Sequence, residues 1–341
     1  METIRADLHN HLRTSDRLYG GDFNQAIDLA RKRLGVSPAI GIVNFSDRRY
    51  EEFSGLPGYD RAFVGEGKRA FYVRKPGVLV VKGQEVPTKE GHVLAFGLPS
   101  GVHLKDNCTL EDTLKEAEDN GAAVIADHPF YLSGIGKTLE RNPELLSKFD
   151  ALEVHNGEAA AFCMPFPGVA NRKAQRFYDK FKKDFPHLGA ISSSDGHSMY
   201  ELGSSYTVML KPDLTSDETF AKTFKDSVRR CRSKLIHQKT NSFVGGVDHM
   251  ADLAVIIGAL KAGRYVPAIK SLVPRSQIYG ANKPQESECP IESSGETIAT
   301  DESPAGASTT PLTRQPSESF EAYLARKRKE TAEFLRSIRK D

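Results

Sequence analysis

The sequence predicts an α/β fold in which helices cover a largely parallel sheet. Short apolar runs of strand length alternate with amphipathic stretches from residue 3 to about residue 210. Repeated β-then-α units imply a parallel sheet, and this many units suit either a closed barrel or a doubly wound open sheet. No GxGxxG motif opens a helix after the first strand, which disfavours a dinucleotide-binding fold.

The first units lie before residue 84. The chain runs from its first residues straight into a predicted strand. Apolar residues at helical spacing then predict a helix from residue 23 to 34, with Asp22 placed to cap its start and Gly35 to end it. Residues 39–44 predict a short buried strand, and residues 78–82 predict another that Gly83 closes.

The later units repeat the pattern. Thr109 and Asp112 are spaced as a capping box at the start of a helix predicted to end at residue 119. A strand at 122–127 follows Gly121, and further strands are predicted at 151–155 and 189–194. The helix between these last two strands carries apolar residues at helical spacing: Ala174, Phe177, Tyr178 and Phe181.

Composition divides the rest of the chain. We expect a main domain at residues 1–240 and a helical extension at 241–280. Residues 281–319 are rich in Ser, Thr, Pro, Glu and Gly and contain no aromatic residue, which predicts a disordered linker. Residues 320–341 regain an amphipathic helical pattern with a basic middle turn. That helix could dock or contact an anionic surface, but a solvated charged helix is the favoured interpretation.

Charge and cysteine usage exclude several classes of protein. The net charge of +2 and the pI near 8.2 are too mild to indicate nucleic-acid binding, although they are compatible with phosphorylated substrates. The four cysteines are scattered and form no CxxC pair, which gives zinc-ribbon and thioredoxin folds no support.

Without an apolar signal core or a membrane-length apolar run, we expect a cytoplasmic protein that does not contact membranes. The sequence leaves the oligomeric state open.

The first chemical signal is the segment at residues 7–11, Asp-Leu-His-Asn-His. Residues i and i+2 of a strand point to the same face, so His9 and His11 can reach one metal ion together. The pair ends the first predicted strand and leads into a loop that carries Asp16. In β/α barrels, catalytic groups collect at that end of the strands.

The same geometry recurs near the end of the domain, where Asp195 and His197 follow a predicted strand with the same spacing. Between the two pairs, Glu85 follows the strand at 78–82 and precedes His92 by seven residues. Six of the ten histidines lie at or beside predicted strand ends: His9, His11, His92, His128, His155 and His197. The remaining four are interpreted as structural or exposed: His103, His187, His237 and His249.

These motifs, in this order, resemble the PHP domain of the polymerase and histidinol phosphatase superfamily over roughly residues 3–210. The matching series runs from Asp-Leu-His-Asn-His through Asp16, Glu85 and His92 to Asp-His-Pro at 127–129, Glu-Val-His-Asn at 153–156 and Ser-Asp-Gly-His-Ser at 194–198. The resemblance implies a distorted (β/α)7 barrel that holds two or three Mn, Fe or Zn ions.

The resemblance also implies a set of metal ligands. The first ion would be bound by His9, His11, Glu85 and Asp195. Glu85 would bridge to a second ion that is also bound by His92 and His128. Asp16 and His197 would hold a third ion. Ser46 stands where the family has a further histidine, and a hydroxyl is a poor ligand for these metals, so we expect two tightly bound ions and a third that is weak or absent.

The implied chemistry is phosphate ester hydrolysis. Two ions bridged by Glu85 would share a water, lower its pKa and supply hydroxide, while Asp16 or His197 protonates the leaving oxygen. His155 would contact the substrate, and four arginines near the motifs could clamp its phosphate: Arg13, Arg48, Arg49 and Arg172.

Three functions remain open at this stage. We expect a phosphatase that acts on a small phosphorylated metabolite or a nucleotide, with histidinol phosphate as one candidate. A nuclease for short oligonucleotides is the first alternative, although the sequence has no plain groove of basic and aromatic residues. A degenerate domain that serves as a scaffold is the second alternative, and it would be expected to have lost several ligands rather than one.

The linker supplies a prediction. Truncation at about residue 280 should leave turnover of a small substrate largely unchanged, because a disordered linker adds little to a packed core. Comparing kcat/KM of the full and truncated chains on one small substrate measures this. An insoluble or inactive truncated chain would place the tail within the catalytic domain.

Overall fold

The computed structural model describes residues 2–12, 23–45, 47–131, 133–160, 168–197, 199, 201–233 and 236–237. All of them belong to one of the two compact units into which the chain divides, Met1–Cys289. Several predictions lie outside the described residues: the extension at 241–280, the linker at 281–319, the tail helix at 320–341, and the roles of Arg13, Asp16, Asp22 and Ser46.

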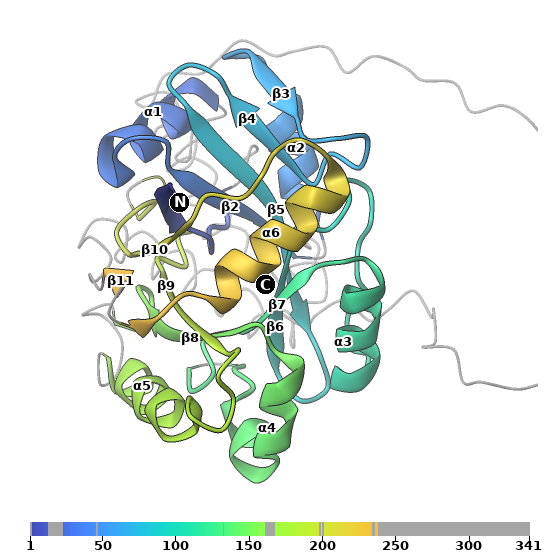
Figure 1. The fold of residues 1–341 in the computed structure, drawn as a ribbon, viewed down its shortest axis with the longest axis vertical. Helices are drawn as coiled ribbons and strands as arrows, with labels where there is room; N and C mark the ends of the chain where they lie inside the picture. Colours follow the sequence, from blue (N-terminus) through green and yellow to red (C-terminus); the bar gives the residue numbers. More distant parts are fainter. Residues whose placement is uncertain are drawn as a thin grey trace, which may run out of the picture. The chain divides into compact units, whose positions relative to one another are not determined.

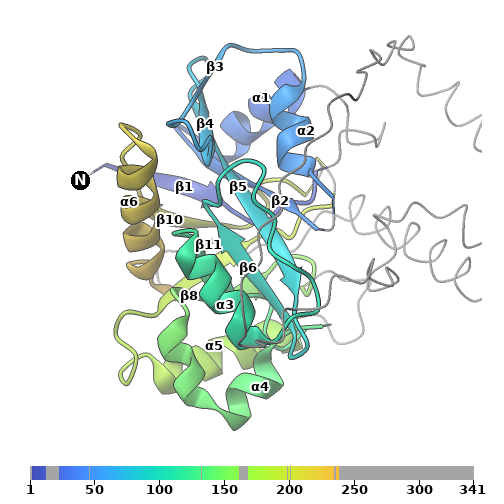
Figure 2. The ribbon, with the colours of Figure 1, turned by 90° about the vertical axis from the view of Figure 1, so that its right-hand side faces the viewer.

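The described strands form a sheet that curls into a nearly closed barrel (Figures 1 and 2). Seven of them follow one another around it: β1 (Thr3–Asp7), β2 (Ala39–Asn44), β5 (Val78–Pro87), β6 (His92–Phe96), β7 (Ala123–Ala126), β8 (Ala151–Asn156) and β9 (Gly189–Ser193). The segments after β9 and β1 then meet, because Asn10 forms a parallel bridge with Gly196 and the backbone N–H of His11 donates to the Gly196 carbonyl at 2.7 Å. The structure therefore favours a barrel over an open doubly wound sheet.

The strand directions differ from a regular (β/α)7 arrangement in one place. β6 is antiparallel to both β5 and β7, whereas the other neighbouring pairs in this ring are parallel. β5 also runs on to Pro87, so the prediction that Gly83 closes the strand was wrong. Gly83 is required for packing instead, because a Cβ there would lie 2.5 Å from Cε1 of the Phe96 ring.

Four short strands extend this ring. β3 (Arg61–Phe63) and β4 (Ala70–Val73) form an antiparallel hairpin that pairs with the edge of β5. β10 (Tyr206–Leu210) is antiparallel to β1, and β11 (Ile236–His237) pairs with β10. These additions lengthen the sheet beyond the predicted strands without changing the ring itself.

Three of the six described α-helices, Phe23–Leu34, Leu110–Asp119 and Val169–Phe181, were predicted from the sequence, and the other three were not. The six are α1 (Phe23–Leu34), α2 (Arg49–Gly55), α3 (Leu110–Asp119), α4 (Gly136–Arg141), α5 (Val169–Phe181) and α6 (Asp217–Arg229), with a 3-10 helix at Pro143–Lys148. α1 buries the five apolar residues that predicted it. The α3 cap is also confirmed, since the Thr109 hydroxyl accepts from the Asp112 backbone N–H at 3.2 Å.

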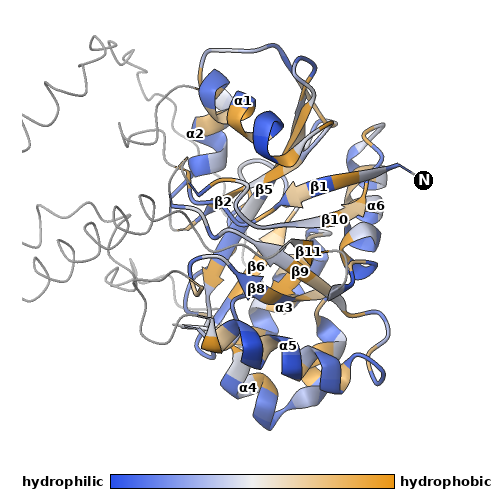
Figure 3. Ribbon diagram, turned by 90° about the vertical axis from the view of Figure 1, so that its left-hand side faces the viewer, coloured by the Kyte–Doolittle hydropathy of each residue, from blue (hydrophilic) through white to orange (hydrophobic). Residues whose placement is uncertain are grey.

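Three apolar clusters hold these layers together. One lies between α1 and the outer face of β2 and β5, and another lies between α3, α4, α5 and the outer face of β6, β7 and β8. The third fills the barrel interior and includes Phe220, Phe224 and Val228 from α6. In Figure 3 the outward parts of α1, α4 and α5 are hydrophilic, in agreement with this division.

Helix α6 closes one end of the barrel. Figure 2 places it on the side from which β1 starts. The carbonyl of Val228 approaches Gly189, the first residue of β9, so closely that no Cβ would fit there, and Ala190 N–H donates to the Cys231 carbonyl at 3.1 Å. The amino ends of the strands are therefore plugged by apolar side chains, and the carboxyl ends are left for chemistry.

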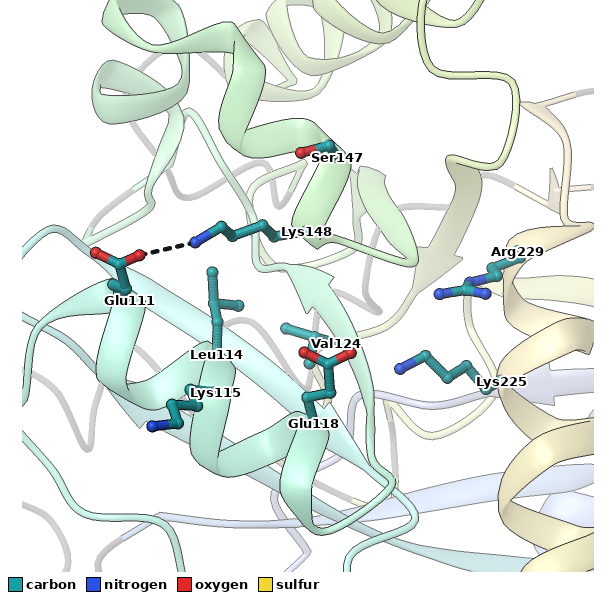
Figure 4. Close-up of a pocket in the computed structure, with 9 residues that line it drawn as sticks. All are labelled: Glu111, Leu114, Lys115, Glu118, Val124, Ser147, Lys148, Lys225 and Arg229. Carbon is teal, nitrogen blue, oxygen red and sulfur yellow. Dashed lines mark hydrogen bonds and ion pairs between the residues drawn. The ribbon is translucent and has the colours of Figure 1, made fainter.

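A pocket of about 420 Å³ lies at the plugged end, between α3, α6 and the amino end of β7 (Figure 4). Its lining mixes both charges, and Lys148 forms an ion pair with Glu111 at 3.0 Å across its rim. No residue predicted to bind metal lines it. Within the described part of the chain, no helix combines the length and apolar character needed to cross a bilayer.

Gly41 tests the packing of the barrel. A Cβ there would overlap the Leu8 carbonyl oxygen and lie 2.8 Å from Cε1 of Phe96, so Gly41→Ala should lower the free energy of unfolding by about 3 kcal/mol or more. Gly55→Ala is the matched control, because no atom lies within 4 Å of its Cβ position at the end of α2. It should stabilise the protein by about 0.5 kcal/mol. Urea denaturation measures both, and equal effects would contradict this packing.

Candidate metal centre

The side chains that face the barrel interior change from apolar to ionisable along four of the strands. In β7, Ala123 and Ile125 pack in the interior cluster, and the same alternation leads to Asp127. In β9, Ile191 packs inside and the alternation leads to Asp195. β5 ends its inward row with Glu85 in the same way. The antiparallel β6 brings in its ligand at its amino end instead, with His92. A buried polar layer therefore forms at one end of the barrel.

His9, His11 and Asp195 form the first group of this layer. The Nε2 atoms of the two histidines are 2.9 Å apart, and Asp195 Oδ1 lies 3.3 and 3.5 Å from them. Two ligand atoms that are each about 2.1 Å from one ion are separated by roughly 3.0–3.5 Å. The three side chains therefore have the spacing of ligands that share one cation.

Glu85 links this group to a second one. Its Oε2 lies 3.0 Å from His11 Nε2 and 3.6 Å from His9 Nε2. Its Oε1 contacts Nδ1 of His92 and lies 3.5 Å from Nε2 of His128. The side chain is buried, and each oxygen faces a different set of histidines. This is the arrangement of a carboxylate that can bridge two ions.

A third group contains a residue that the sequence prediction missed. Glu158 Oε2 lies 3.7 Å from Nδ1 of His197, and Asp195 Oδ1 lies 3.8 Å from the same nitrogen. Tyr131 donates its hydroxyl to the other oxygen of Glu158 at 3.3 Å. Glu158 follows β8 by two residues, so the rule of strand ends could have included it. Asp16, the other ligand expected here, lies outside the described residues.

Glu153 contacts His9 and the backbone of His128, and with His9 and Asp127 it forms a further group of possible ligands behind the first one. The Nδ1 of His9 donates to Glu153 Oε1 at 3.4 Å, which leaves His9 Nε2 as the nitrogen that faces the first group. Its other oxygen accepts from the backbone N–H of His128 at 2.9 Å. Outer partners of this kind fix the tautomer and orientation of ligating histidines. The sequence contained Glu153 within a motif but gave no sign of this role.

Asn156 connects the same carboxylate to Asp195. Its side-chain amide donates to Glu153 Oε2 at 3.1 Å and to Asp195 Oδ2 at 2.9 Å. Asp195 has a φ of 51°, in the left-handed region that costs most residues energy. The Asn156 amide therefore holds the Asp195 carboxylate so that its other oxygen, Oδ1, faces the histidines.

Asp7 fixes the segment that carries the histidine pair. It is fully buried and accepts from the backbone N–H and hydroxyl of Ser194, at 3.0 and 2.6 Å, and from the Gly203 N–H at 2.6 Å. Burial raises the pKa of Asp7 to about 6, although these hydrogen bonds oppose the shift. The contacts tie the end of β1 to the segment after β9, where the ring closes.

Burial sets the ionisation of the carboxylates in the layer. It raises the pKa of Asp195 to about 8 and the pKa of Asp127 well above its usual value. For Glu85 and Glu153, burial acts in the same direction but is outweighed by neighbouring histidines. These hold the pKa of Glu85 well below its usual value and the pKa of Glu153 at about 2.

The imidazoles respond in opposite ways. Burial lowers the pKa of His11 to about 3, so its ring is neutral and carries a lone pair for a cation. Burial would also lower the pKa of His128, but Asp127 and Glu85 raise it to about 10. The carboxylates around His9 likewise outweigh burial and raise its pKa well above the usual value. A cation that bound to this layer would compete with the protons on these side chains.

The described residues that were predicted to contact the substrate differ in their exposure. Arg48 and Arg172 are exposed, and Arg13 lies outside the described residues. Arg49 is buried, where it donates to the His11 carbonyl at 3.0 Å and to Asp47 at 2.7 Å. His155 is buried, with its Nδ1 3.2 Å from the Asn171 amide. Arg49 thus supports the backbone of a predicted ligand, and the substrate contacts of the other residues remain predictions.

Comparison with known proteins gives distant matches. No family model matches the sequence, and no curated protein sequence matches it. Among solved structures, PsfC from Pseudomonas syringae PB-5123 is similar at 17% identity and a TM-score of 0.48, over 80% of this chain and 100% of that one. The lesion-specific endonuclease PfuEndoQ from Pyrococcus furiosus is similar at 16% identity and a TM-score of 0.45, over 67% of this chain. This chain spans 56% of the length of the endonuclease, and at such TM-scores neither likeness carries a functional conclusion.

Glu153→Gln tests the supporting role of this side chain. The amide keeps the shape but can no longer hold His9 through a charged acceptor, so binding of Mn²⁺ should weaken by about 10- to 100-fold. Isothermal titration calorimetry of the metal-free protein measures the change. Glu111→Gln, an exposed glutamate at the far pocket, is the control. Equal affinities in the two variants would contradict the role assigned to Glu153.

Proposed function

We propose that this protein is a metal-dependent hydrolase that cleaves phosphate monoesters of a small metabolite or nucleotide. The observation that supports this most is the Glu85 carboxylate, with one oxygen toward His9 and His11 and the other toward His92 and His128. A carboxylate between two imidazole groups suits a pair of Mn, Zn or Fe ions. The proposal includes membership of the PHP superfamily, which rests on the motifs of the sequence.

The residues proposed to hold the ions are those already brought together. The first ion would be held by His9, His11, Glu85 and Asp195, and the second by Glu85, His92 and His128. Bound ions of this kind neutralise phosphoryl charge and make water more acidic. Asp16 and His197 are proposed to deliver the proton to the leaving oxygen, and Arg13, Arg48, Arg172 and His155 to contact the substrate.

Other described side chains would orient the ligands and limit the direction from which substrate approaches. Glu153 and Asn156 keep His9 and Asp195 in their orientations, which reduces reorganisation when the ions and substrate bind. The apolar plug around α6 closes the other end of the barrel, so substrate must approach from the carboxyl ends of the strands. The retained histidines and carboxylates favour an enzyme over a degenerate scaffold.

Glu85→Gln tests the proposed function. It replaces the one carboxylate placed between both histidine groups, so bound metal should fall and phosphatase activity should drop at least about 1,000-fold. Elemental analysis and a panel of nucleotides, sugar phosphates, histidinol phosphate and short oligonucleotides measure both effects. Glu118→Gln, at the far pocket, is the control.

Three outcomes would contradict the proposal. Full activity and unchanged metal content in Glu85→Gln would remove the assigned site. A wild-type protein that binds no divalent cation, and that cleaves none of the panel in its presence, would remove the hydrolase. Cleavage of oligonucleotides alone would identify a nuclease instead of a phosphatase.

A further inference from the structure

Asp127 is a buried carboxylate that the ligand set above does not use. It follows β7 directly and has no exposed surface. It continues the inward row of Ala123 and Ile125, so its side chain faces the barrel interior. Neither of its oxygens accepts a hydrogen bond from any residue that the structure describes. A carboxylate in such a position is costly unless it is protonated or faces a positive charge, which either a protonated imidazole or a metal ion can supply.

The imidazole nitrogen that a carboxylate oxygen faces shows whether the carboxylate can share an ion with that histidine or only supports the ring. Asp127 Oδ2 lies 3.2 Å from Nε2 of His128, and that nitrogen is also the one that lies 3.5 Å from Glu85 Oε1. Asp127 therefore meets His128 on the side where an ion would be bound. A group that only orients an imidazole sits on the opposite nitrogen, as Glu153 does at His9.

The spacing also fits coordination. Asp127, Glu85, His92 and His128 each offer one ligand atom, and these atoms all lie within 4.8 Å of one another. The separation of 3.2 Å between Asp127 and His128 falls in the range of roughly 3.0–3.5 Å expected for two ligands of the same ion. The other oxygen of Asp127 lies 3.5 Å from Nδ1 of His9, behind the first group.

We propose that Asp127 is a fourth ligand of the second ion, which it binds through Oδ2. Its Oδ1 at the same time supports His9, so one carboxylate joins a ligand of each ion. Two imidazoles and two carboxylates form a donor set for a divalent cation such as Mn²⁺, Fe²⁺ or Zn²⁺. The inference rests on the proposed function, because it assumes that the layer binds metal.

Asp127→Asn tests this inference, because an amide has nearly the same shape and mimics a protonated acid. If Asp127 is a ligand, the variant should lose one of two ions, or bind it at least about 100-fold more weakly, since a neutral amide oxygen is a weaker donor. Elemental analysis after dialysis against Mn²⁺ and titration calorimetry measure this. Asp106→Asn is the control, because Asp106 is a partly buried carboxyl near His92 that belongs to none of the groups.

The outcomes separate the two proposals. A folded Asp127→Asn variant that binds two ions as tightly as the wild type would make Asp127 a structural side chain, either protonated or paired with a protonated histidine, and would leave the proposed function intact. A wild-type protein that binds no divalent cation would overturn both. Circular dichroism establishes that each variant is folded.

A second variant gives a direct signature. Asp127→Cys places a thiol at the same position, and a thiolate that coordinates Co²⁺ produces a charge-transfer absorption band in the near ultraviolet. We expect this band in the Co²⁺-loaded variant and not in the wild type, whose described cysteines, Cys108 and Cys231, are absent from the ligand groups. A variant that binds two Co²⁺ ions without the band would overturn the inference.

Discussion

The need to keep buried charges compensated governs this structure. The interior of the barrel is apolar toward α6 and ionisable at the other end, so carboxylates and imidazoles are packed together as buried side chains. At ordinary protein dielectric, such groups tolerate burial only when each faces an opposite charge, a proton or a cation. Crowded, buried carboxylates raise the free energy of the folded protein when nothing compensates their charge. The same carboxylates make the layer suited to bind cations.

Closure of the ring follows from the same constraint. Asp7 accepts hydrogen bonds from Ser194 and Gly203. The bridge between Asn10 and Gly196 joins the residue between the two histidines to the residue after Asp195. The two ends of the sheet are therefore joined where the first group of ligands needs them to be joined. Asn156 and Glu153 extend this support to β8, so the orientation of the ligands depends on three strands rather than on one loop.

Local patterns were sufficient for much of the fold. The five apolar residues of α1, the Thr109 N-cap of α3 and the buried run of β2 each depend on neighbours a few positions away, and each was confirmed. Gly83 was misinterpreted because a glycine in an apolar run resembles a strand end. Glycine is required at position 83 because the Phe96 ring on the neighbouring strand leaves no room for a side chain. The antiparallel direction of β6 likewise has no local signature in the sequence.

The sequence by itself determined which residue types stand at the strand ends, and together with the family resemblance this was enough to single out His9, His11, Glu85, His92, His128, Asp195 and His197 as candidate metal ligands. All seven side chains are buried or nearly buried. Only the tertiary structure decided how their atoms are paired. It placed the two oxygens of Glu85 toward different histidines, brought Glu158 to His197, and separated Glu153, behind His9, from Asp127, in front of His128. These distinctions depend on which side of an imidazole a carboxylate meets. The curvature and register of strands far apart in the chain set that geometry, and no local spacing encodes it.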